Sequence, residues 1–78
     1  MKRRRLTGTL LKWILCRRGR VVTCQLDKAG NRYRVSIQPC GQRDRIVGLF
    51  DATATAFQRH AALVAGLRDN GWTTVAYR

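Results

Sequence analysis

The chain reads DATATAFQRHAALVAGLRDNGWTTVAY over residues 51–77, and this stretch predicts one capped helix followed by a strand. Four apolar side chains recur in it at spacings of four, three and three residues, which places them on one face of a helix with 3.6 residues per turn. They are Phe57, Ala61, Val64 and Leu67. Such a stripe is stable only against a second apolar surface, so we expect the helix to cover a sheet formed by the preceding residues.

Both ends of this helix carry cap residues. Asp51 is the predicted N-cap, because its carboxylate accepts hydrogen bonds from free backbone amides; Thr53 takes that role if the helix begins later. At the other end, Gly71 suits the left-handed position that follows many helices. Trp72 is then expected to fold back onto Leu67, the apolar contact that accompanies such a cap.

Three strand-like runs precede the helix, at residues 20–26, 32–38 and 45–50, and another follows it at 73–77. The first two alternate apolar and polar residues, as strands with one buried face do. Their inward-facing residues are Val22, Cys24, Leu26, Tyr33, Val35 and Ile37. Turn-forming residues at 27–31 predict a hairpin between them. The predicted fold class is α+β: a small antiparallel sheet, in the order β-β-β-α-β, packed on one face by a single long helix and preceded by a basic N-terminal arm.

The run at residues 45–50 fits two phases, which exchange the faces of the strand. In the favoured phase, Ile46 and Phe50 pack beneath the helix and Arg45 lies on the opposite, open face of the sheet. Gly48 then marks a bulge or a point of close approach.

Charge favours a polyanionic partner. The sequence carries 16 Lys and Arg against 4 acidic residues, all aspartates, for a net charge of +12. Most of the basic residues are arginine, whose planar guanidinium matches phosphate and carboxylate groups. Residues 1–20 contain no acidic residue and hold +8 of this charge.

One domain is the most that 78 residues support, and it is predicted at residues 20–78 behind a basic arm at residues 1–19. We do not expect the arm to act as a secretory signal, because Lys12 interrupts its apolar part. Its apolar run is also too short to span a bilayer, which takes about 20 apolar residues. Three interpretations stay open. The arm is disordered when free and binds nucleic acid through its arginines, or it docks Leu10, Trp13 and Ile14 on the domain or on a second subunit, or it reflects a start codon placed too far upstream.

The predicted function is nonspecific binding of DNA or RNA through phosphate contacts, without catalysis. Arginines of the arm and of the open sheet face are the expected contacts, beside short polar side chains that suit phosphate. They are Arg3, Arg4, Arg5, Arg17, Arg18, Arg20, Arg32, Arg34 and Arg45. Single-strand binders also stack bases on aromatic rings, and Trp13 of the arm is the one ring expected to be free for this.

Two alternatives belong to other classes. In the first alternative, the protein is a homodimeric interaction module whose charge is incidental. Its two copies are joined through apolar residues of the open sheet face, Val21, Val47 and Leu49. In the other, the arm attaches to an anionic membrane through Leu10, Trp13 and Ile14, which cluster on a helical wheel.

Catalytic chemistry has few residues to use. His60 is the single histidine, Ser36 the single serine, and glutamate is absent, so we expect no enzyme activity and no cofactor. Three cysteines stand at spacings of eight and sixteen residues, without the close pairs of zinc sites, so no metal site is expected. Their odd number also argues against a disulfide scaffold and favours the reducing cytoplasm. They are Cys16, Cys24 and Cys40.

Overall fold

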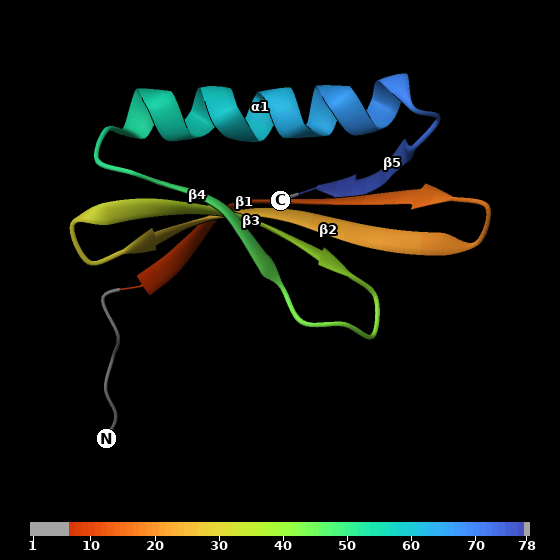
Figure 1. Ribbon diagram of the computed structural model, residues 1–78, viewed down its shortest axis with the longest axis horizontal. Helices are drawn as coiled ribbons and strands as arrows, with labels where there is room; N and C mark the ends of the chain where they lie inside the picture. Colours follow the sequence, from red (N-terminus) through yellow and green to blue (C-terminus); the bar gives the residue numbers. More distant parts are fainter. Residues whose placement is uncertain (1–6, 78) are drawn as a thin grey trace.

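The computed structural model of the chain describes residues 7–77, which form one antiparallel sheet and one helix (Figure 1). The elements are β1 (Thr7–Arg17), β2 (Arg20–Ala29), β3 (Arg32–Pro39), β4 (Arg45–Phe50), α1 (Thr53–Asp69) and β5 (Thr73–Tyr77). In the sheet the strands lie in the order β4-β3-β2-β1-β5. The helix covers one face, and no described element covers the other, which we call the open face. The predicted α+β fold is confirmed, with one strand more than expected.

The additional strand, β1, corrects the prediction of an arm at residues 1–19. Residues 7–17 lie inside the sheet between β2 and β5, and Leu15, opposite Val22, has no exposed surface. The segment fits a helical wheel and also a two-residue alternation, in which Leu11, Trp13 and Leu15 share a face. The segment forms a strand because pairing with β2 buries the face that carries Leu15 beneath the helix. The remainder of the predicted arm, residues 1–6, lies outside the described residues.

Two tight turns join the first three strands, and the second is shorter than the sequence predicted. Arg18 and Gly19 join β1 to β2 with φ angles of 52° and 77°, the positive pair that a type I′ hairpin turn requires. Gly30, with φ of 65°, begins the turn between β2 and β3. Because that turn is so short, Asp27 belongs to β2 rather than to the turn predicted at residues 27–31.

The N-cap prediction is wrong, whereas the C-cap prediction is confirmed. The N-cap of α1 is Ala52, without a side-chain hydrogen bond, and Asp51 contacts Arg32 instead. At the other end Gly71 has φ of 94° and its amide donates to the carbonyl of Arg68, at 3.1 Å. The Trp72 amide donates to the Leu67 carbonyl at 3.0 Å, which completes a Schellman motif.

The face of α1 that meets the sheet is rotated relative to the predicted stripe. Val64 is buried and Leu67 is half-buried, as expected, but Phe57 and Ala61 are exposed. The helix instead buries Ala56 and His60, which contact the sheet together with Val64 and the half-buried Leu63. The many alanines of the helix make several faces apolar, so the stripe alone does not fix the rotation.

The core lies between α1 and the strands β1, β2 and β3. The buried apolar side chains of the sheet come from positions that the alternation predicted in β2 and β3 and from Leu15 of β1: Leu15, Val22, Cys24, Leu26 and Val35. Nε2 of His60 lies 3.1 Å from the carbonyl oxygen of Cys24, in the middle strand. A carbonyl only accepts, so Nε2 carries the proton, and this hydrogen bond ties the helix to the sheet.

A bulge in β4 changes the facing of its first residues. Phe50 and Gly48 pair with residues of β3 that face the helix, as predicted for Phe50, and a Cβ at Gly48 would meet the Phe50 ring at 2.6 Å. The register then shifts, so Ile46 lies on the open face and Arg45 pairs with Ile37 on the helix side. The predicted positions of Ile46 and Arg45 are therefore wrong.

Candidate functional site

Two turns far apart in the sequence meet at one end of the sheet. The turn between β1 and β2 lies beside the loop between β3 and β4, because Val22 pairs with Pro39 and the Cys40 amide donates to the Val21 carbonyl at 2.9 Å. The C-terminal end of α1 reaches the same end of the molecule, since Thr73 pairs with the final residues of β1 (Figure 1). Residues from three parts of the chain thus surround one end of the fold.

Five exposed arginines gather there, and we call this group the basic end: Arg17, Arg18, Arg20, Arg43 and Arg45. Asp44 is the acidic residue of the two turns that carry them. Within residues 7–77 the ion pairs involve Arg32 and Arg34, so no arginine of the basic end is paired with a carboxylate there. Unpaired guanidinium groups keep all their donors for an external anion.

The helix end completes this surface. A Cβ atom at Gly71 would lie 3.2 Å from Nε of Arg17, so the Arg17 side chain lies against the C-terminal cap of α1. A cation is favoured at that position because the helix dipole is negative there. Arg68 adds a further exposed positive charge in the last helical turn.

A hollow of about 660 Å³ opens between the two turns and the end of α1. Its apolar lining comes from the core side of the sheet and from the helix end: Val22, Ile37, Leu67 and Trp72. Two arginines of the basic end, Arg20 and Arg45, line it together with Pro39 at the end of β3 and the turn residues Gly19, Cys40 and Gln42. The hollow therefore combines an apolar wall with cationic groups, and its volume falls within the range of about 300–1,000 Å³ typical of ligand sites.

The aromatic ring beside the basic end is Trp72, not Trp13. Trp72 is half-buried: it packs against the core cluster around Leu15 and also lines the hollow. Trp13, predicted as the free platform, stacks on Tyr77 with ring centroids 5.1 Å apart and meets the edge of the His60 ring. That prediction is wrong, because β1 carries Trp13 into the sheet and turns it toward the helix.

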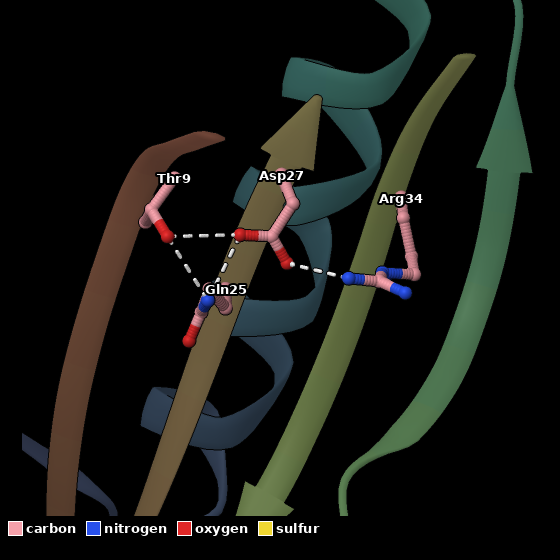
Figure 2. A network of polar contacts seen from close by, with 4 residues as sticks. All are labelled: Thr9, Gln25, Asp27 and Arg34. Atoms are coloured by element: carbon pink, nitrogen blue, oxygen red, sulfur yellow. Dashed lines mark hydrogen bonds and ion pairs between the residues drawn. The ribbon is translucent and has the colours of Figure 1, made fainter. Parts of the chain in front are cut away.

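Arg32 and Arg34, both predicted to bind phosphate, lie away from the basic end. Nε of Arg32 is 3.3 Å from a carboxylate oxygen of Asp51, in an exposed ion pair. Arg34 Nη2 lies 3.5 Å from Oδ2 of Asp27, whose side chain is largely buried (Figure 2). Both guanidinium groups already have a carboxylate partner, so the sheet face offers less free positive charge than the sequence predicted.

Asp27 is the centre of a polar network on the open face (Figure 2). The Thr9 hydroxyl donates to Oδ1 of Asp27 at 3.0 Å, and the Gln25 amide donates to the same oxygen at 2.8 Å. With Arg34 on Oδ2, three side chains satisfy one carboxylate that is only 6 % exposed. We therefore assign this network a structural role in the sheet, because a buried carboxylate is tolerated only when it is paired in this way.

Of the remaining predicted contacts, Arg3, Arg4 and Arg5 lie outside the described residues. Arg43 joins the basic end although the sequence did not single it out. The signal that would have found it is the strand pairing itself, which places the loop between β3 and β4 beside the turn at Arg18 and Gly19.

The thiols and the single histidine form no joint site. Cys16, Cys24 and Cys40 are all free thiols, and Cys40 is exposed whereas Cys24 is fully buried. Among residues 7–77, no three His, Cys, Asp or Glu side chains gather as ligands for a metal ion.

We expect Cys40 to be alkylated rapidly by a maleimide at about pH 8, and Cys24 to stay unmodified in the folded protein. Burial raises the pKa of the Cys24 thiol from 9.0 to about 11, so the reactive thiolate is scarce as well as inaccessible. Between pH 9 and 11 the Cys24 thiol ionises in the unfolded chain but stays protonated in the folded protein. The free energy of unfolding therefore falls as the pH rises through this window. Mass spectrometry of peptides, with a urea-unfolded control, measures the labelling. Equal rates at the two thiols would contradict the packing described here.

Comparison of the chain with protein-family models found no match. Searches against curated proteins and against solved structures likewise found no significant similarity. Within the described residues, α1 is not long and apolar enough to cross a membrane.

Proposed function

We propose that this protein binds nucleic acid without catalysis, through phosphate contacts made by the basic end. The observation that carries the proposal is the gathering of five exposed arginines, all unpaired within residues 7–77, from two turns that lie more than 20 residues apart in the sequence. Guanidinium groups bind phosphate oxygens through parallel hydrogen bonds, and such contacts do not depend on base sequence. The partner is therefore DNA or RNA of unrestricted sequence.

Positive charge outweighs negative charge at this end of the molecule. Asp44 of the loop and Asp69 of the last helical turn lie there, beside the five arginines of the basic end and Arg68. The other two aspartates, Asp27 and Asp51, are engaged by Arg34 and Arg32 elsewhere. Residues 2–5 contribute four further positive charges to a net charge of +12. This net charge attracts a polyanion to the protein from solution. The free thiols fit a reducing compartment such as the cytoplasm, where nucleic acid is accessible.

The test is fluorescence anisotropy of a labelled oligonucleotide, single-stranded and duplex, across a series of salt concentrations. Each phosphate contact releases counterions, so about four contacts predict that log Kobs falls against log salt with a slope between about −3 and −4. A matched titration with dextran sulfate measures attraction to any polyanion. Absence of binding even at low salt, or a slope near zero, would contradict the proposal.

A second candidate is self-association through the open face and the edge strand β4. In the described part of the chain this strand has no neighbour on one side, and its apolar side chains are unusually exposed: 56 % for Ile46, 37 % for Val47 and 50 % for Leu49. Exposed apolar edges favour pairing with another chain. Light scattering at high salt decides, since a dimer formed in this way persists when charges are screened and is abolished in Leu49→Lys. A monomer at every concentration would rule this candidate out.

A further inference from the structure

We propose that the hollow beside Trp72 holds one nucleotide of a single strand, with the base on the indole and its phosphate between Arg20 and Arg45. This inference rests on the proposed nucleic-acid function and assigns it a ligand form. It explains why an aromatic ring and two arginines line the same hollow, from elements that are distant in sequence.

The chemistry of the lining matches the two parts of a nucleotide. Trp72, Leu67 and Ile37 form an apolar wall, to which the flat face of a base is suited. Arg20 and Arg45 line the same hollow and, within residues 7–77, have no carboxylate partner. Since an aromatic ring stacks on any base, such a site binds without strong sequence preference.

Trp72 is held in place before any ligand arrives. Its amide is fixed by the hydrogen bond to the Leu67 carbonyl, and its ring packs against the core cluster that contains Leu15 and Val22. A ring that is already ordered loses little conformational freedom when a base stacks on it, which favours binding. The left-handed Gly71 is what directs Trp72 back toward the sheet.

A duplex does not fit the same hollow, because its bases are stacked and paired inside the helix. Duplexes are expected to use only the phosphate contacts of the basic end, whereas single strands gain the stacking contact as well. The protein therefore prefers single strands, by roughly tenfold for one stacked base.

The first test compares Trp72→Leu with Trp72→Phe, in binding to an oligothymidylate and to a duplex of equal length. Leucine removes the aromatic face and keeps an apolar side chain, whereas phenylalanine keeps a smaller aromatic face. We expect Trp72→Leu to weaken oligothymidylate binding about tenfold with duplex affinity unchanged, and Trp72→Phe to retain most of the affinity. Equal losses for both nucleic acids, or no loss for either, would overturn the inference.

A second test uses the wild-type protein and so does not depend on the folding of a variant. Cys40 lines the hollow and is exposed, so its alkylation rate reports on occupancy. Saturating oligothymidylate is expected to slow alkylation at least fivefold relative to saturating duplex. Thymidine monophosphate, with inorganic phosphate as its control, distinguishes a free nucleotide from a polymer as the source of the base.

The outcomes separate the two proposals. If the wild-type chain binds neither single strands nor duplexes, the proposed function itself fails. If it binds both with equal affinity and neither oligothymidylate nor the monophosphate protects Cys40, the nucleotide site is wrong while the phosphate-binding function stands. Protection by the monophosphate alone would keep the site and identify a free nucleotide as its ligand.

Discussion

Replacing Arg20 and Arg45 together by alanine is expected to weaken oligonucleotide binding about thirtyfold at constant salt, from two phosphate contacts of roughly 1 kcal/mol each. The same variant should make the salt dependence shallower, by about one unit of slope for each arginine–phosphate pair that it removes. Both side chains are exposed, so the fold is expected to persist. Anisotropy measures affinity and slope, and circular dichroism checks the fold.

The matched control is Lys28→Ala with Arg59→Ala, which removes the same charge from two exposed positions outside the basic end. It lowers only the general attraction of the protein for a polyanion, so we expect at most about a threefold loss. Equal losses for the two double variants would mean that total charge, and not the basic end, carries the binding.

The second large effect concerns Asp27, whose replacement by alanine is expected to lower the free energy of unfolding by roughly 3 kcal/mol. The change leaves Arg34 without its carboxylate and the Thr9 and Gln25 donors without their shared acceptor. Nε of Arg34 is already buried without a partner, so the remaining guanidinium becomes costly to keep in place. Urea unfolding, followed by circular dichroism, measures the loss.

Asp51→Ala is the matched control, since Asp51 also pairs with an arginine but its side chain is 86 % exposed. Exposed ion pairs contribute about 0–1 kcal/mol, and Asp51 forms no cap on α1, so we expect less than about 1 kcal/mol here. If Asp27→Ala were no more destabilising than Asp51→Ala, the network in Figure 2 would contribute little to stability.

The strands β2 and β3 and the presence of the helix were predictable because their apolar residues repeat with a clear period, although the face that α1 buries was not. Leu26 and Val35 have no exposed surface, as their alternation predicts. The C-cap was predictable for a different reason: only a glycine adopts the left-handed position at Gly71 without strain.

The strand β1 and the phase of β4 were not predictable in the same way. Residues 7–17 satisfy a helical and a strand pattern at once, and the burial of Leu15 against Val22 decides between them. In β4 a single bulge exchanges the faces of Ile46 and Arg45, and no residue type in the run fixes where a bulge will form.

The arginines of the candidate site were mostly visible in the sequence, but their grouping was not. The alternation predicted Arg45 beside Arg32 and Arg34 on the open face, whereas the bulge in β4 turns Arg45 to the helix side, at the end of the sheet that holds Arg18 and Arg20. Arg32 and Arg34 are in addition paired with Asp51 and Asp27, and a single sequence does not reveal which residues become such neighbours in space.

The most direct test of the central claim is a titration of the ¹⁵N-labelled protein with an oligonucleotide, followed by chemical-shift changes of backbone amides and arginine Nε–H groups. The basic end and its hollow predict that the largest changes fall in residues 17–22, 39–45 and 67–73, with small changes around Asp27 and Arg34. Changes that centre on the open face, on the Asp27 network or on β4 alone would contradict the account and place the partner elsewhere on the sheet.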